Sequence, residues 1–431
     1  MKKYNIIIEF LRIIDADREA RRFIRLFRGG NPVRFAVIKL GGTVIENSLK
    51  MIAADLAYLS NLDLFPIVIH GGGRQIDRAL QQVKLPYIKR GGLRVTIEEQ
   101  LPIIKKVLDK INEELVESIK SYGGYAVGLT ENIFIARKCE DEALCYVGRI
   151  EHINLEKITH VIKDKKIPII SSIGNANNGH YYNINADEAA KAMVLAVKPK
   201  KYIIITDEGG IKNKYGEIIP NICLDEEFVK LENSGIITGG MLLKVKEAKD
   251  LLSKIKYSLP IQITSGNHLL KELFTYKGKG TFIKLGSNIE EHYSWDGLDK
   301  DRIKKLVWKS FGKHLVDWYF ELPIDSIIIE RFYKGIAVVI SIKGMYYLDK
   351  FCVSEEAQGQ GIGQDIWNHL IDKYRCLFWR SRKENSVNIW YFQKADGCVK
   401  VGKWVMFWIN LNEEQVKEAI KYISNLEETL C

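Results

Sequence analysis

The stretch FAVIKLGG, residues 35–42, decides the fold of the first part of this chain. It is a short apolar run that ends in a glycine pair, and the same order returns in FPIVIHGGG, residues 65–73. Short apolar runs bounded by glycine are typical of buried strands, and helical periodicity follows each glycine turn. The two stretches therefore predict strand–turn–helix units, with ligand-binding turns at the carboxyl ends of parallel strands.

Apolar runs and helical patterns continue to alternate down to residue 284. Strands that are apolar throughout need helices on both faces, so the sequence predicts an α/β fold, an open and mainly parallel sheet between helical layers. We place this domain at residues 31–284, preceded by amphipathic helices in residues 1–30. The predicted strands are 35–40, 65–69, 167–171, 202–206 and 261–264, and the predicted helices are 48–60, 74–83, 98–121, 185–197 and 241–254.

A different pattern begins after residue 284. Residues 285–300 are polar and rich in turn formers, which predicts a linker. Residues 301–431 contain close-spaced strands and few helices, which is typical of a separate α+β domain. The predicted strands are 326–330, 335–342, 345–353, 376–380, 387–392 and 404–409, and the predicted helices are 301–320, 363–374 and 412–425.

Charge and cysteine content limit the class of protein. The chain has 64 basic and 54 acidic residues, a formal charge of +10, which suits either an anionic small-molecule partner or a solvated lysine-rich surface. The basic residues are scattered, so we expect no nucleic-acid partner. Seven cysteines form no C-x-x-C pair, which favours reduced thiols in a cytoplasmic protein and no zinc site. No apolar run approaches the ~18 residues that a membrane helix needs, so we expect no membrane association.

Lys39 stands at the end of the first predicted strand, directly before Gly41 and Gly42. Glycine lets backbone N–H groups approach a phosphate closely, and the following helix adds the positive end of its dipole. The turn after the second strand, from His70 to Gly73, repeats the arrangement. Neither turn fits a Walker motif or G-x-G-x-x-G, and each by itself is equally well explained as a tight strand-to-helix connection.

Three further strings turn these weak motifs into a specific pattern. They are GGLRVT at residues 91–96, NINAD at 183–187 and GGMLLK at 239–244. Together with the glycine turns, they resemble the amino-acid kinase family over residues 34–284, and within it the N-acetylglutamate kinases. The resemblance implies phosphoryl transfer from MgATP to the γ-carboxylate of N-acetylglutamate.

The resemblance also implies roles for individual residues. Lys39 and Lys244 would flank the transferred phosphoryl group, and Asp187 would hold both lysines in place. Because the attacking carboxylate is already ionised at neutral pH, no general base is needed, and magnesium would arrive with ATP without a protein metal site. Gly41, Gly42, Gly72 and Gly73 would line the phosphates and the acyl substrate, Arg94 and Asn183 would bind N-acetylglutamate, and Asp207 would belong to the nucleotide segment.

Another glycine-rich turn, QGQGIG at residues 358–363, follows a predicted strand and opens a helix. Its N–H groups would face a diphosphate, with the helix dipole behind them. The string resembles the coenzyme-binding loop of the GNAT acetyltransferases, although that family often has an acidic residue at position 360. With the strings around it, the resemblance extends over residues 290–431 to the acetyltransferase domain of N-acetylglutamate synthases. It implies that acetyl-CoA is bound by Gln358, Gly359, Gln360, Gly361 and Gly363.

Glutamate carries two carboxylates, so its site needs several fixed cationic donors. Residues two apart in a strand point to the same face, so Arg380, at the end of the predicted strand 376–380, and Arg382, just after it, suit this need. The alternative is that Arg380 and Arg382 form surface ion pairs, and that Tyr391 is a residue of the hydrophobic core without a role in the chemistry. The resemblance implies that Lys350 and Asn385 also bind glutamate, that Cys352 and Val353 meet the acetyl thioester through backbone groups, and that Tyr391 donates a proton to the departing CoA thiolate.

The stretch ELFTYKGKGT, residues 272–281, resembles arginine-inhibited members of the kinase family. It implies an allosteric L-arginine site in which Glu272, beside Gly278, pairs with the guanidinium. Asn267 stands where those enzymes usually have a histidine. The same resemblance implies a homo-oligomer, which we expect to be a tetramer.

The sequence thus predicts a bifunctional enzyme of arginine biosynthesis. It would acetylate the α-amino group of L-glutamate and then phosphorylate the γ-carboxylate of that product. A second interpretation keeps the synthase but makes the kinase domain a non-catalytic arginine sensor. A third is an acetyltransferase for protein lysines or RNA, although the paired arginines favour a small dicarboxylate.

Overall fold

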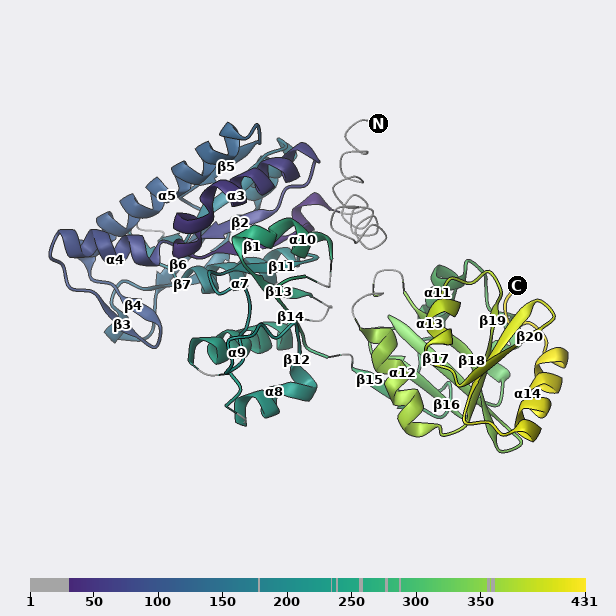
Figure 1. The fold of residues 1–431 in the computed structure, drawn as a ribbon. Helices are drawn as coiled ribbons and strands as arrows, with labels where there is room; N and C mark the ends of the chain where they lie inside the picture. Colours follow the sequence, from purple (N-terminus) through teal and green to yellow (C-terminus); the bar gives the residue numbers. More distant parts are fainter. Residues whose placement is uncertain are drawn as a thin grey trace. The chain divides into compact units, whose positions relative to one another are not determined.

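The computed structural model describes residues 31–176, 179–233, 235–237, 239–255, 259–275, 278–286, 288–354, 357 and 361–431. Contacts within the chain divide it into two units, Met1–Gly286 and Ser287–Cys431 (Figure 1). The helices expected in residues 1–30 lie outside the described residues. Each unit is built around a large sheet of its own.

The first unit contains an eight-stranded sheet that is mainly parallel, as predicted. The neighbouring strands β13, β11, β1, β2, β8 and β5 run parallel to one another, whereas β14 is antiparallel to β13. The five apolar runs of the sequence are central or near-central strands, and nearly all their residues are buried. In spatial order the strands are β12 (Asn221–Cys223), β14 (Thr281–Lys284), β13 (Ile261–Thr264), β11 (Tyr202–Ile205), β1 (Val37–Leu40), β2 (Ile67–His70), β8 (Ile167–Ser171) and β5 (Ala126–Leu129).

Helices cover both faces of this sheet (Figure 1). Helices α3 and α5 contact each other on one face, and α7 contacts β1 and β2 on the other. Crossover connections between parallel strands are right-handed, so helices fall on opposite faces when the chain moves in opposite directions along the sheet. The chain moves one way from β1 to β2 and the other way from β8 to β11. Among the described helices, none is both long and apolar enough to cross a membrane. The helices are α3 (Gly42–Asn61), α4 (Gly73–Gln82), α5 (Leu101–Ser121), α6 (Leu155–Lys163), α7 (Ala186–Val197), α8 (Leu224–Asn233), α9 (Gly239–Ser253) and α10 (Leu269–Phe274).

The sequence does not predict two smaller β structures of this unit. One is a four-stranded sheet in the order β10-β9-β6-β7, and the other is the hairpin of β3 and β4. Their strands are short or largely exposed, so they lack the apolar runs that mark the main sheet. They are β3 (Ile88–Arg90), β4 (Leu93–Val95), β6 (Phe134–Lys138), β7 (Gly148–Ile153), β9 (Ile173–Asn175) and β10 (Tyr181–Asn183).

The second unit contains a seven-stranded sheet in which β18 and β19 form the only parallel pair that is described. These two strands pair only through residues 346–348 and 377–379, and both continue beyond the last pair. In spatial order the strands are β15 (Ile289–His292), β16 (Ser326–Glu330), β17 (Gly335–Ile342), β18 (Met345–Val353), β19 (Leu377–Arg382), β21 (Trp404–Ile409) and β20 (Gly397–Val401). The helices are α11 (Lys300–Phe311), α12 (Ile362–Lys373), α13 (Asn388–Phe392) and α14 (Glu413–Asn425).

Three predictions for the second unit differ from the structure. Residues 387–392 form helix α13, not a strand, because the preceding residues turn the chain: Asn388 N donates to Asn385 O and Tyr391 N donates to Val387 O. The segment 285–300 is not simply a linker, since β15 within it pairs with β16. The helix expected over 301–320 stops at Phe311, where Gly312 adopts the left-handed conformation (φ 67°).

Candidate active sites

The two glycine turns of the first unit contact each other. A methyl group added at Gly42 would lie 2.6 Å from Gln75 Oε1 and 3.0 Å from Gly73 N, so only glycine permits this approach. A methyl group added at Gly71 would lie 3.0 Å from Ala186 Cβ, in the first turn of α7. The N-termini of α3, α4 and α7 therefore converge at the carboxyl ends of β1 and β2, which makes a seat for anions.

Lys39 and Asp187 meet at this seat, although they lie far apart in the chain. Lys39 Nζ is 2.9 Å from Asp187 Oδ1 and 3.1 Å from Oδ2. Asn185 caps α7 by accepting from Asp187 N at 2.7 Å, which fixes the position of the carboxylate. The pair is partly exposed, with 12% and 35% of the side chains accessible, so a ligand can reach it.

Lys244, the second predicted lysine, is not held by Asp187 as expected. Its Nζ lies 3.6 Å from the Glu208 carboxylate, in the predicted nucleotide segment. Helix α9 is instead joined to α7 by Lys191, which lies 3.8 Å from Glu247. Asp187 therefore contacts one of the two lysines, and α9 places the other beside the segment after β11.

Asp207, also in that segment, accepts a hydrogen bond from Asn47 Nδ2 at 3.1 Å. This contact ties the segment after β11 to the first turns of α3. The predicted nucleotide segment therefore lies next to the helix that begins at Gly42.

Arg94 is almost fully buried and has one unsatisfied donor. It forms an ion pair with Asp77, and Nη2 donates to Gly73 O at 3.1 Å. Nη1 is buried and has no hydrogen-bond partner among the described residues. A buried guanidinium nitrogen without a hydrogen-bond partner costs free energy. A carboxylate that accepted a hydrogen bond from this nitrogen would remove that cost. Asn183, the other predicted substrate residue, donates to Thr96 Oγ1 at 3.0 Å, two residues from Arg94.

His70, directly before the second glycine turn, is fully buried. Burial lowers its pKa to about 4, so the ring is neutral at physiological pH. Its Nε2 lies 3.0 Å from Asn112 Nδ2, in helix α5. The histidine thus links strand β2 to the helix that covers it.

The predicted arginine site at Glu272 is closed in this structure. The Glu272 carboxylate is buried and accepts from Lys279 N at 2.7 Å, Gly280 N at 3.0 Å and Gln262 Nε2 at 2.8 Å. A side chain at Gly278 would overlap the carboxylate. Glu272 therefore serves to fold residues 278–280 back onto α10, and it offers no free oxygen to a guanidinium here.

The predicted coenzyme loop is described in part. Gln358, Gly359 and Gln360 lie outside the described residues. Gly361 begins helix α12 with φ 86°, a conformation that favours glycine. A methyl group at Gly363 would lie 3.3 Å from Val353 Cγ2, so the start of α12 lies against the end of β18.

The separation of β18 and β19 opens the sheet beside this helix. Asp349 is an extra residue in β18, a bulge where Lys350 pairs with Val338 and Leu348 with Val339. The described ladder between β18 and β19 ends at Leu348. Cys352 and Val353 lie beyond this point, where β18 still pairs with β17. Burial raises the pKa of the Cys352 thiol to about 12, which makes it a poor nucleophile.

Arg380 and Arg382 lie together over one aromatic ring. Their guanidinium carbons are 4.4 and 4.7 Å from the ring centroid of Trp404, on the neighbouring strand β21. The arginines contact the end of the chain: Arg380 donates to Leu426 O at 3.1 Å, and Arg382 Nη2 lies 2.7 Å from the Glu428 carboxylate. The two predicted arginines thus lie close together, and both bind oxygen atoms of the chain's own last residues.

Lys350 belongs to the same cluster. Its Nζ lies 2.7 Å from Asp349 Oδ2 and donates to Thr429 Oγ1, and Asp349 also accepts from Tyr319 OH at 2.9 Å. Asn385 lies in the turn after β19, where its Oδ1 accepts from Val387 N at 3.2 Å. Lys350 and the two arginines therefore converge, whereas the Asn385 side chain is engaged in the turn.

Tyr391 lies on α13 in a cluster of aromatic rings. Its ring centroid is 5.4 Å from that of Trp379 and 5.5 Å from that of Phe407. Burial, together with the nearby Cys352, raises the pKa of the phenol well above its ordinary value. The hydroxyl therefore stays protonated, which is the form that a proton donor needs.

Several residues at these sites were not predicted. Asp77, Asp349, Trp404 and Glu428 are ordinary polar or aromatic residues outside the quoted strings, and Thr96 ends the string GGLRVT without a predicted role. Trp404 could have been found from strand pairing, since it lies opposite Arg382 in register. Among the described residues, no group of three or more His, Cys, Asp or Glu is placed to hold a metal ion.

Comparisons with known proteins match both units. Residues 34–265 match the model of the amino acid kinase family, and residues 290–427 match the model of the N-acetyltransferase of N-acetylglutamate synthase. An acetylglutamate kinase of Xanthomonas campestris pv. campestris is 35% identical over 421 residues, which cover 96% of this chain and 99% of that one. Protein ARG5,6, mitochondrial, of Candida albicans is 30% identical, over 96% of this chain and 50% of that one.

A solved structure shares the fold of the chain. The N-acetylglutamate synthase of Neisseria gonorrhoeae, crystallised with coenzyme A and N-acetylglutamate, matches with a TM-score of 0.66 at 22% identity, over 95% of this chain and 96% of that one. Both sites described above thus lie in units with known counterparts. The chain belongs to the amino acid kinase family and carries, C-terminal to its kinase domain, an N-acetyltransferase domain of the N-acetylglutamate synthase type.

Proposed function

We propose that the chain acetylates the α-amino group of L-glutamate in its second unit and phosphorylates the γ-carboxylate of N-acetyl-L-glutamate in its first. One observation carries the proposal: a single chain holds two anion sites of different construction. The first is made of helix N-termini and a lysine–aspartate pair, which suit the phosphates of ATP. The second is a cluster of cations beside an opened pair of strands, which suits a dicarboxylate next to a thioester.

In the kinase step, a γ-carboxylate oxygen attacks the γ-phosphorus of MgATP and ADP leaves. Both partners are anions, so catalysis consists mainly of bringing them together and neutralising the charge that moves. Lys39, held by Asp187, lies at the point where the helix N-termini converge. The unpaired Nη1 of Arg94 would receive the α-carboxylate.

In the acetyl step, the free amine of glutamate attacks the thioester carbonyl of acetyl-CoA. The C–S bond breaks, and the departing thiolate takes a proton from the Tyr391 hydroxyl. The proton that the attacking nitrogen loses passes to solvent, from which the Tyr391 phenol is restored. Cys352 and Val353, on β18 beyond its last pair with β19, would orient the thioester. Arg380, Arg382 and Lys350 would hold the carboxylates.

The position of Lys244 favours a second candidate function. Since it pairs with Glu208 and not with Asp187, the first unit lacks one of its expected contacts. A synthase whose kinase unit only binds an effector would tolerate this arrangement. The two candidates differ in whether the chain releases ADP.

Replacing Lys39 by alanine should lower kcat for ADP release by about 100-fold or more, because a preorganised cation is lost from the transition state. The measurement is ADP formation with N-acetylglutamate and MgATP. Acetyl transfer on the same variant is the internal control and should not change, since its site lies in the other unit. Background ADP release by the unmodified chain, with no effect of Lys39→Ala, would reject the kinase.

Arg94→Lys should raise KM for N-acetylglutamate about tenfold. The lysine ammonium is a point charge, and it cannot reproduce the two hydrogen bonds that a planar guanidinium can form. Steady-state kinetics with N-acetylglutamate as the varied substrate measure this. Arg90→Lys is the matched control, since Arg90 is exposed in the same hairpin. Equal changes in KM at both positions would contradict a substrate role for Arg94.

Tyr391→Phe should lower kcat for acetyl transfer about 100-fold, the usual range for a lost general acid. Because burial raises the pKa of Tyr391, the unmodified chain should show no fall in rate from tyrosine ionisation as pH rises from 7 to about 10. Rates of CoA release across that range test both statements. A descending limb near pH 9, or a fully active phenylalanine variant, would refute them.

We also propose L-arginine as an effector, supported by a Neisseria gonorrhoeae relative crystallised with it, which is 20% identical. Binding at Glu272 requires Lys279 and Gly280 to release the carboxylate first. Titration with L-arginine should therefore change at least one of the two rates, and Glu272→Gln should weaken the response. Constant rates up to millimolar arginine would exclude the site.

The tetramer and the cytoplasmic location stay predictions from the sequence. Several relatives carry the word mitochondrial in their names, including the Candida albicans protein.

A further inference from the structure

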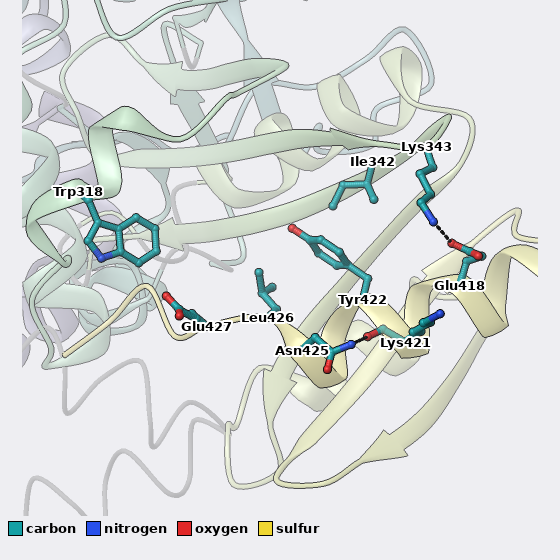
Figure 2. A pocket seen from close by; sticks show the side chains of 9 residues that line it. All are labelled: Trp318, Ile342, Lys343, Glu418, Lys421, Tyr422, Asn425, Leu426 and Glu427. Carbon is teal, nitrogen blue, oxygen red and sulfur yellow. Dashed lines mark hydrogen bonds and ion pairs between the residues drawn. The ribbon is translucent and has the colours of Figure 1, made fainter.

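The last residues of the chain lie across the predicted glutamate site. They leave the C-terminal end of α14 at Leu426 and Glu427, beside a pocket of about 420 Å³ that Trp318 and Tyr422 also line (Figure 2). From there the segment runs over the cations of β18 and β19. We call residues 426–431 the C-terminal tail.

The tail supplies an oxygen to each of the three predicted glutamate-binding cations. Arg380 donates to two backbone carbonyls, Leu426 O at 3.1 Å and Glu427 O at 2.9 Å. Arg382 pairs with the Glu428 carboxylate at 2.7 Å. Lys350 donates to Thr429 Oγ1.

Glu428 is the tail residue that most resembles the substrate. Its carboxylate lies between Arg382 and Lys403, so it is held by two cations as a free amino-acid carboxylate would be. The two bonds lower the pKa of Glu428, so the group is ionised at neutral pH. The tail thus places a glutamate side chain where the enzyme is expected to bind glutamate.

Backbone bonds hold the far end of the tail. His314 and Cys431 exchange two hydrogen bonds, of 3.1 and 2.9 Å, and Val316 N donates to Thr429 O at 3.3 Å. Thr429 is buried, whereas Glu427 and Cys431 are exposed. Leu426 and Leu430 pack against the hydrophobic clusters of this unit, so opening the tail breaks these apolar contacts as well as its polar contacts.

We propose that the C-terminal tail is an intramolecular competitor of glutamate, which must leave Arg382 before the substrate can bind. The inference rests on the proposed acetylation of glutamate. A site that is competent only when the tail is displaced has an apparent affinity reduced by the fraction of displaced molecules. The pocket beside Leu426 gives the start of the tail space to move into.

A permanent role is the competing explanation. In that case the tail is a fixed wall that orients Arg380 and Lys350 for the substrate. The two explanations predict opposite effects on KM, because weakening a competitor helps the substrate while weakening a wall harms it.

The test compares Glu428→Gln with Glu427→Gln. Both remove one negative charge from the tail, but Arg382 binds the side chain of Glu428, whereas Arg380 binds only the backbone carbonyl of Glu427. Glu428→Gln should lower KM for L-glutamate about three- to tenfold with kcat within about twofold, the range expected for a partly exposed charged contact. Glu427→Gln should leave both constants unchanged.

A second measurement reports the tail directly. Hydrogen exchange at the amides of His314, Val316 and Cys431 should become faster when the unmodified chain is saturated with L-glutamate, because the tail bonds open. An unchanged or higher KM in Glu428→Gln, or slower exchange with glutamate, would overturn the proposal. If the unmodified chain and both variants fail to acetylate glutamate at all, the proposed function fails first and this inference falls with it.

Discussion

Parallel strands end at the same edge of a sheet, and the first unit depends on this constraint. Because β1 and β2 are neighbours, the helices that follow them begin side by side, and α7 brings a third N-terminus to the same point. A single helix N-terminus stabilises an anion by only about 0.3–1 kcal/mol. Lys39, at the end of β1, adds a full positive charge to these partial charges and is itself held by Asp187.

The second unit is constrained by three cations that lie close together and need partners. Arg380, Arg382 and Lys350 are partly or fully withdrawn from water, and an unpaired cation in that position is unfavourable. Trp404 covers the two arginines from one side, and Asp349 offsets Lys350. The tail completes the compensation, because Glu428 pairs with Arg382 and Thr429 accepts a hydrogen bond from Lys350.

In both units the candidate site lies at the ends of strands, but the opening beside those strands is formed in different ways. In the first, helix N-termini and glycine turns surround an opening at the edge of a continuous sheet. In the second, the opening is inside the sheet, where β18 and β19 separate after three paired residues. Backbone groups released from the ladder can then bind a ligand, as they would another strand.

Local patterns determined much of this protein. The five apolar runs, the glycine turns and the strand that carries Arg380 were all readable from the sequence, because burial and turn geometry depend on neighbouring residues. That strand continues past its predicted end to Arg382. Helix α13 was not, since the turn at Asn385 overrides a stretch rich in aromatic residues that favours a strand. Strand β15 was missed because its polar residues lie at the edge of a sheet.

The sequence by itself determined which groups the sites would use: lysine, arginine, tyrosine and the glycine turns. Only the tertiary structure decided which charges meet. It placed Asp187 on Lys39 but Glu208 on Lys244, buried Glu272 under residues 278–280, and brought Glu428 to Arg382. The physical reason is that an ion pair forms between groups close in space, and residues far apart in the chain carry no mark of their future neighbours.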